Sequence, residues 1–167
     1  MRNKNVSVMV EGALMIALSF GLSFIRIFRM PQGGSVTLGA MVPLLIFDLR
    51  HGAGPGILAG VAFGLLDVIG DPYIVHPAQL ILDYPLAYGL LGLAGLFRKN
   101  EVVGAFVGIF ARFLAHFASG IIFFASYAEG NVYAYSAGYQ GSYLLPEFVI
   151  SAVILLVLRR TAIMNKV

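Results

Sequence analysis

Six apolar stretches, separated by short breaks rich in Gly, Pro, Asn and Asp, constrain this chain more than any other feature. They cover about residues 6–28, 35–49, 53–70, 77–96, 102–126 and 139–160. A helix needs roughly 20 apolar residues to cross a bilayer. The second stretch is short and contains Pro43, so we expect it to be tilted or incomplete. The sequence predicts an all-α integral membrane protein, a bundle of six transmembrane helices in one membrane domain, residues 1–167.

Composition agrees with this class and excludes several kinds of site. Of the 167 residues, 59% are hydrophobic and 11% are charged, whereas soluble domains carry about 25% charged residues. The absence of cysteine excludes disulfides and thiolate chemistry. The three histidines have no metal-ligand spacing. We therefore expect no metal, no cofactor and, since the net charge of +3 belongs to membrane loops, no nucleic-acid partner.

The distribution of lysine and arginine predicts the orientation in the membrane. If the N-terminus is cytoplasmic, the loops at 29–35, 71–76 and 127–138 share the outer side, which keeps only Arg26 and Arg29. Cytoplasmic loops normally carry the excess of positive charge, so we expect both termini to be cytoplasmic. The positive residues on the inner side would be Arg2, Lys4, Arg50, Arg98, Lys99, Arg159, Arg160 and Lys166.

The fourth apolar stretch contains a carboxylate, Asp83. An ionisable side chain at membrane depth is costly, so it normally faces the bundle interior, where it meets a partner or a ligand. Gln79 precedes Asp83 by four residues, and residues at this spacing share one face of a helix. We expect both side chains to line a polar cavity that binds a cation.

The fifth stretch carries Arg112, His116 and Ser119 on one helical face. An arginine within the membrane requires a partner, and the candidates are Asp83 and Glu147. We expect a buried ion pair that fixes helix positions. His116 lies one turn nearer the outside and is expected to face Asp83.

The last loop and the sixth stretch are rich in tyrosine. An aromatic belt at the membrane interface accounts for some of these residues, but not for Gln140 and Glu147, which share a helical face with Tyr143. Tyrosine rings also bind cationic or aromatic ligands. The predicted cavity, open to the outside, suits a small, flat, positively charged heteroaromatic molecule. The tyrosines are Tyr127, Tyr133, Tyr135, Tyr139 and Tyr143.

Three further features have two interpretations each. The loop of Gln32, Gly33, Gly34 and Ser35 predicts either a flexible lid with glycine hinges or a tight turn. Ala13 and Ala17 allow close helix approach, within the chain or with another protein. Asp67 is interpreted as a carboxylate that reaches water at the interface; a proteolytic pair with Asp83 is disfavoured, because the sequence contexts of intramembrane aspartyl proteases are absent.

Three separated motifs resemble the thiamine-specific S components of energy-coupling factor (ECF) transporters, over nearly the whole chain. They are Met30-Pro31-Gln32-Gly33-Gly34-Ser35, His76-Pro77-x-Gln79-Leu80-x-Leu82-Asp83-Tyr84 and Ala115-His116-x-x-Ser119-Gly120-x-x-Phe123-Phe124. The resemblance implies a six-helix subunit of the bacterial cell membrane that captures thiamine outside and delivers it through one transmembrane coupling protein and two ATPases. No Walker-type phosphate loop occurs in the chain, so any ATP hydrolysis must come from partners.

The resemblance also implies roles for single residues. Ala13 and Ala17 match the Ala-x-x-x-Ala motif that contacts the coupling protein, and Asp83 matches the acid that compensates the thiazolium charge. This chain has no tryptophan, and Gly33 and Phe124 stand where some members have one. Its stacking partners must therefore be tyrosine and phenylalanine. The predicted substrate-binding residues are Tyr73, Gln79, Asp83, Tyr84, His116, Phe124, Tyr135, Tyr139 and Gln140.

The sequence thus predicts a binding subunit without enzymatic activity. Two alternatives stay open at this point. One is an S component for another small heteroaromatic vitamin or a thiamine precursor, and the other is a standalone carrier or an intramembrane enzyme.

Overall fold

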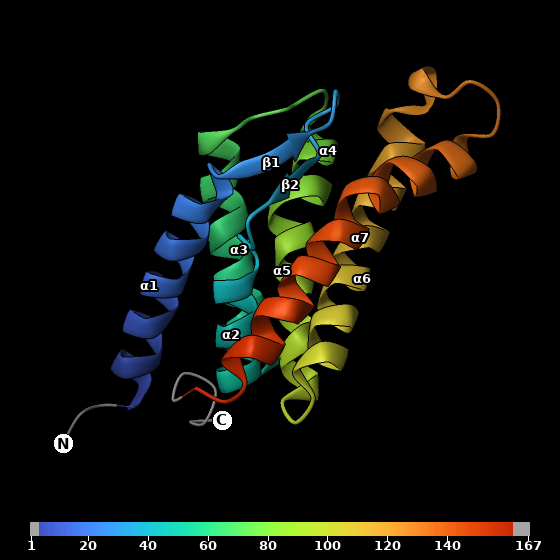
Figure 1. Ribbon diagram of the computed structural model, residues 1–167. Helices are drawn as coiled ribbons and strands as arrows, with labels where there is room; N and C mark the ends of the chain where they lie inside the picture. The colour runs from blue at the N-terminus through green and yellow to red at the C-terminus, as the bar shows by residue number, and fades with distance from the viewer. Residues whose placement is uncertain (1–3, 162–167) are drawn as a thin grey trace.

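Six helical segments and one β-hairpin make up the computed structural model, which describes residues 4–161 (Figure 1). The fourth segment, Pro77–Phe97, is one continuous helix in four parts. Arg2 and Lys166, which contributed to the predicted orientation, lie outside the described residues. The elements are α1 (Lys4–Ser23), β1 (Arg26–Arg29), β2 (Ser35–Thr37), α2 (Val42–His51), α3 (Ala53–Gly70), α4 (Pro77–Ile81), η1 (Leu82–Leu86), α5 (Ala87–Leu91), η2 (Gly92–Phe97), α6 (Glu101–Phe123), η3 (Ala125–Tyr127) and α7 (Val132–Leu158).

Five of the six segments are long and apolar enough to cross a membrane. The exception is α2, whose ten residues span about 15 Å. Pro43 occupies its first turn, and residues 42–49 are all buried. The expectation that the second helix is incomplete is therefore confirmed: α2 is a short helix inside the bundle, surrounded by longer ones.

The boundaries of four predicted helices, the first, second, fifth and sixth, were wrong. The first helix ends at Ser23, and residues 26–29 pair with residues 35–37 as an antiparallel hairpin instead of continuing two helices. The fifth ends at Phe123 and is followed by the short η3. The predicted loop 128–138 is helical from Val132, because Asn131 caps α7 by accepting hydrogen bonds from the amides of Tyr133 and Ala134.

The hairpin, the loop at 71–76 and the segment at 124–131 share one end of the bundle, which we call the hairpin end (Figure 1). Lys4, Arg50, Arg98 and Arg159 lie at the opposite ends of their helices. This arrangement groups the three predicted outer loops and separates them from most of the positive charge.

A row of glycines on α3 brings it into backbone contact with the fourth helix. A Cβ atom on Gly60 would lie 2.7 Å from the carbonyl carbon of Tyr88, and one on Gly64 would lie 2.8 Å from the Cα of Pro85. Gly56 is packed in the same way against Gly92. Small residues four apart permit this close packing between helices in lipid.

The fourth helix widens at η1 into one π-helical turn, which contains Pro85. Proline cannot donate the backbone hydrogen bond of a regular helix, and π-helical turns in α-helices are frequent at functional sites. Asp83 and Tyr84 lie in this turn. The turn therefore sets the direction of the carboxylate that the sequence singled out.

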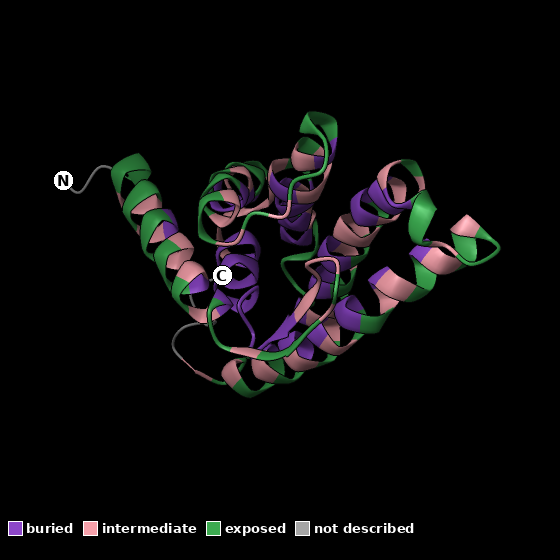
Figure 2. Cartoon of the chain, turned by 90° about the horizontal axis from the view of Figure 1, so that it is seen from above, coloured by how far each residue is buried: buried purple, intermediate pink, exposed green. Residues whose placement is uncertain are grey.

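The first helix lies at the edge of the bundle and is mostly exposed along its length (Figure 2). Glu11 on α1 forms ion pairs with Arg50 (2.6 Å) and His51 (3.1 Å) at the end of α2. Gly12 faces the Phe47 ring, which a Cβ atom would meet at 3.1 Å. These contacts hold α1 to α2 and leave its outer face free of the bundle.

Candidate ligand-binding site

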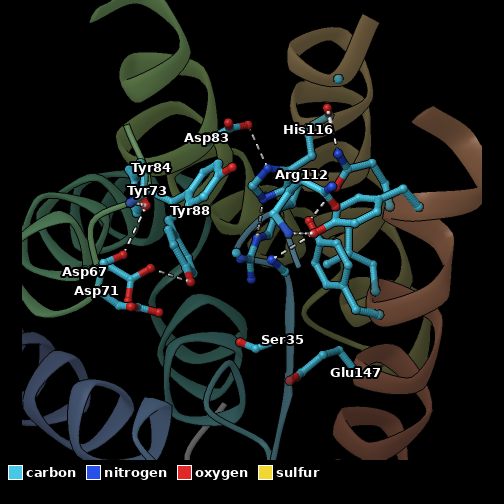
Figure 3. Close-up of a pocket in the computed structure, with 18 of the residues that line it drawn as sticks. Ser35, Asp67, Asp71, Tyr73, Asp83, Tyr84, Tyr88, Arg112, His116 and Glu147 are labelled. Atoms are coloured by element: carbon cyan, nitrogen blue, oxygen red, sulfur yellow. Dashed lines mark hydrogen bonds and ion pairs between the residues drawn. The ribbon is translucent and has the colours of Figure 1, made fainter. Parts of the chain in front are cut away.

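A cavity of about 120 Å³ opens at the hairpin end and reaches into the bundle (Figure 3). A buried water needs roughly 10–15 Å³ by this kind of measure, so the cavity has room for a small organic molecule. Its wall combines residues of the hairpin with residues of α3, η1, α5, α6 and α7. Four carboxylates line it against two guanidinium groups: Asp67, Asp71, Asp83 and Glu147, with Arg26 and Arg112.

Asp83 is the best-supported carboxylate in the cavity. Its Oδ2 accepts hydrogen bonds from Gln79 Nε2 (2.6 Å) and Ser119 Oγ (2.8 Å), and its Oδ1 contacts His116 Nδ1 (2.9 Å). Both oxygens of the carboxyl group thus have polar partners from two helical segments. The expectation that His116 faces Asp83 is confirmed, and these residues bring η1 and α6 together at the cavity.

Gln79 and Tyr84 line the cavity and also hold the loop at 71–76. Gln79 donates to the carbonyl of Tyr73 (3.1 Å) and accepts from the amide of Val75 (3.1 Å). The Tyr84 hydroxyl accepts from the amide of Tyr73 (2.8 Å) and donates to the carbonyl of Asp71 (3.1 Å). Their polar atoms thus position the loop, while the Tyr84 ring remains part of the wall.

Aromatic rings form two other parts of the wall. Tyr73 and Phe124 stack with centroids 6.1 Å apart and planes at 24°. Tyr135 and Tyr139 stack at 6.2 Å and 26°, and Tyr139 meets Tyr143 edge to face at 6.0 Å. All five rings line the cavity. The structure therefore brings the predicted aromatic residues together on both sides of the opening.

The loop of the first motif is a tight turn between β1 and β2. The amide of Met30 donates to the carbonyl of Gly34 (2.6 Å), and the amides of Gln32 and Gly34 both donate to the Tyr139 hydroxyl (3.2 Å each). Gly33 has a positive φ of 93° and lies against Tyr73. Together with Ser35, the turn lines the cavity.

Gln140 is buried between α6 and α7. Its Nε2 donates to the carbonyl of His116 (3.2 Å), and its Oε1 accepts from the Tyr143 hydroxyl (2.5 Å). This amide therefore joins the helix that carries His116 to the helix that carries the tyrosines.

The expected ion pair of Arg112 is absent. Among residues 4–161, no carboxylate lies within the 4.0 Å ion-pair distance of its guanidinium group. Its Nε instead donates to His116 Nε2 (3.2 Å), its Nη1 contacts Met41 Sδ (2.9 Å), and its guanidinium carbon lies 4.0 Å from the centre of the Tyr88 ring. The prediction failed because His116, one helical turn along α6, contacts the guanidinium Nε, while Asp83 is bound by Gln79, His116 and Ser119.

The sequence reasoning missed two polar contacts deeper in the cavity. Asp67 accepts a hydrogen bond from the Tyr88 hydroxyl (3.0 Å) and lines the cavity (Figure 3), so it does not simply reach interfacial water. Glu147 accepts hydrogen bonds from the amide and hydroxyl of Thr37. Asp67 and Glu147 are the single charged residues of α3 and α7, and an isolated charge in an apolar helix is the signal that could have found these contacts.

Ala13 and Ala17 lie in the middle of α1 and do not line the cavity. Both are exposed, in a stripe with Val10, Leu14 and Leu18.

No group of three or more His, Cys, Asp or Glu side chains that could hold a metal ion occurs in the part of the chain that the structure describes.

Comparison with known proteins identifies one family. The sequence model of the thiamine transporter protein family (Thia_YuaJ) matches residues 9–166. The chain belongs to the thiamine transporter family. It is 34% identical to the thiamine transporter ThiT of Bacillus subtilis (strain 168), over 96% of this chain and 94% of that protein. It is 30% identical to ThiT of Lacticaseibacillus paracasei, over 96% and 90% of the two chains.

A solved structure of ThiT from Listeria monocytogenes has the same fold as this member of the thiamine transporter family. The TM-score is 0.89 at 26% identity, over 97% of this chain and 99% of that one. The chain is therefore a multi-pass protein of the cell membrane. Its family role is transport and not enzymatic catalysis.

Proposed function

We propose that this chain is the substrate-binding S component of an ECF-type importer and binds thiamine in the cavity at the hairpin end. The observation that carries the proposal is the Asp83 carboxylate, held by three donors at a cavity with aromatic walls. Thiamine combines a cationic thiazolium with a flat pyrimidine ring. The carboxylate would neutralise the first, and tyrosine faces would stack on both.

In this proposal each predicted site residue has one task. Asp83 supplies the charge, His116 and Gln79 orient it, and Tyr84 and Gln140 shape the wall. Stacking surfaces come from the rings of Tyr73, Phe124, Tyr135 and Tyr139. The hairpin turn closes over the bound ligand. Its residues are Gln32, Gly33, Gly34 and Ser35.

Calorimetry on the detergent-purified protein tests the binding step. We expect Asp83→Asn to bind thiamine at least about tenfold more weakly, because one charge-assisted contact contributes more than about 1.4 kcal/mol. Asp48→Asn is the matched control, since Asp48 is buried against Gly56 and does not line the cavity. Equal thiamine affinity in both variants and the wild type would contradict the role of Asp83.

A competition assay on the same purified protein distinguishes thiamine from the alternative substrates. Riboflavin, biotin and the thiamine pyrimidine should not compete with labelled thiamine at equal concentration. Stronger binding of one of them than of thiamine would assign the cavity to another small ring compound.

The proposal places the hairpin end outside the cell and both termini in the cytoplasm. It is supported by the position of Lys4, Arg50, Arg98 and Arg159 at the opposite end of the bundle. Because the chain has no cysteine, Glu129→Cys and Lys99→Cys give single reactive sites at the two ends. A membrane-impermeant maleimide should label only the first in intact cells, and the reverse pattern would invert the orientation.

The proposal further assigns the exposed stripe with Ala13 and Ala17 to the transmembrane coupling protein, whose two ATPase subunits drive release inside. We expect Ala17→Trp to abolish uptake in cells that contain the coupling module while leaving thiamine binding intact. Leu58→Trp is the matched control, because Leu58 is 73% exposed on α3, away from this stripe. Uptake by this chain without the module would instead indicate a standalone carrier.

A further inference from the structure

Arg112 is a positive charge in the middle of α6 that faces the cavity without a carboxylate partner among the described residues. Figure 3 shows it between His116 and Tyr88. An arginine in this position is costly within a membrane. Its contacts with His116, Met41 and Tyr88 therefore call for a functional reason.

The contact with His116 determines where the imidazole carries its proton. A guanidinium group is protonated at all relevant pH values and has no acceptor atom. Its Nε–H must therefore donate to His116 Nε2, which lies at 3.2 Å, and Nε2 must carry a lone pair. The single ring proton is then on Nδ1, which donates to Asp83 Oδ1 at 2.9 Å.

A second proton on the ring would face the guanidinium directly. Two positive donors would then point at one another across 3.2 Å, which Coulomb repulsion disfavours. Without Arg112, the same ring could take up a proton on Nε2 and form a contact ion pair with Asp83. That ion pair would neutralise the carboxylate that a cationic ligand needs.

No other positive group near the ring can substitute for Arg112 among the described residues. The neighbouring groups are acidic or phenolic, and Asp48 of α2 lies against glycines instead. Acidic neighbours would promote protonation of the imidazole and cannot prevent it. The groups around His116 are Asp83 of η1, Asp67 of α3 and Tyr143 of α7, and those around the adjacent Arg112 also include Tyr88 of α5 and Glu147 of α7.

We propose that Arg112 is a positioning residue that fixes the Nδ1–H tautomer of His116 and keeps the ring uncharged, so that the Asp83 charge stays available to a cationic ligand as the pH falls. This inference rests on the proposed binding of thiamine. At higher pH, where the ring is uncharged in any case, the charge of Arg112 only repels a cation in the same cavity. Removing Arg112 should therefore weaken cation binding at low pH and leave it unchanged or strengthen it at high pH.

The first experiment is the pH profile of thiamine affinity between about pH 6 and pH 8, the range in which an accessible histidine titrates. We expect the wild type to vary by less than about twofold. Arg112→Met should bind thiamine at pH 8 as tightly as the wild type or more tightly, and at pH 6 at least about fivefold more weakly than at pH 8, because one proton competes with the ligand.

Two variants make this result specific. Arg112→Lys should restore a flat profile, because it keeps a protonated donor in reach of Nε2. Arg26→Met removes a positive charge from the same cavity, but Arg26 contacts Asp71 and the carbonyl of Ser23, so its profile should also stay flat. A flat profile for Arg112→Met, or equal weakening at every pH, would overturn the proposal.

The second experiment requires no thiamine. The chain has three histidines, and ¹⁵N spectra of the His51→Gln/His76→Gln protein report His116 alone. We expect a neutral ring with its proton on Nδ1 at every pH from about 6 to 8. A protonated Nε2 would overturn the proposal even if Arg112→Met does not fold. Failure of the wild type to bind thiamine while the ring shows the expected tautomer would contradict only the proposed function.

Discussion

The Glu147 carboxylate on α7 accepts hydrogen bonds from both the amide and the hydroxyl of Thr37 at the end of β2, the second at 2.6 Å. Both residues are buried. Since Thr37 ends the hairpin and Glu147 lies within the last helix, this pair joins segments 110 residues apart in the sequence beside the cavity. The hairpin is therefore anchored to α7 at its base as well as at its turn.

Thr37→Val should destabilise the protein measurably. It removes the hydroxyl donor from a buried carboxylate whose Oε2 already has no partner among the described residues, and a hydrogen bond to a charged group contributes about 1.5–3 kcal/mol. We expect a midpoint several degrees lower in a size-exclusion thermostability assay. Thr161→Val is the control, because Thr161 bonds only its own helix end, and a change of equal size there would contradict the assignment.

Tyr139→Phe should loosen the hairpin turn. The hydroxyl accepts hydrogen bonds from the amides of Gln32 and Gly34, and losing about 1 kcal/mol of such bonding corresponds to about fivefold in a rate or an equilibrium. We expect thiamine to dissociate about fivefold faster in stopped-flow measurements, with little change in its association. Tyr133→Phe removes an exposed hydroxyl from the same helix and should dissociate like the wild type.

Gly34→Ala should displace the turn from the tyrosine wall. A Cβ atom there would lie 2.7 Å from two ring carbons of Tyr143 and 3.2 Å from the Tyr139 hydroxyl, and overpacking of this kind costs about 1–3 kcal/mol. Calorimetry should show thiamine affinity reduced by at least about fivefold. The control is Gly138→Ala on α7, where a Cβ atom meets nothing within 4 Å; equal loss in both variants would exclude a specific clash.

Gly60→Ala should separate α3 from α5. Its Cβ would lie 3.1 Å from the Cα of Gly89 and still closer to the carbonyl of Tyr88. Because backbone atoms cannot rotate away, we expect a loss of about 1–3 kcal/mol, seen as a lower thermostability midpoint. Gly54→Ala on the same helix meets nothing within 4 Å and should be neutral or slightly stabilising. A neutral Gly60→Ala would contradict the backbone packing.

The sequence predicted the helical segments well where length and hydrophobicity decide them. The third predicted helix, 53–70, has the bounds of α3. The hairpin was missed because its strands are four and three residues long and pair across the turn, so hydrophobicity alone reads Arg26–Arg29 as the end of a helix. The glycine row on α3 was visible in the sequence at four-residue spacing and was overlooked.

The composition and the apolar runs determined a helical membrane protein, because a bilayer permits few other ways to satisfy the backbone. Helical spacing also determined that Gln79 and Asp83 share a face. Only the tertiary structure decided that His116 stands between Arg112 and Asp83, and that Glu147 holds the hairpin and not the arginine. These pairings depend on how far helices approach and rotate, and that depends on contacts between residues distant in the sequence.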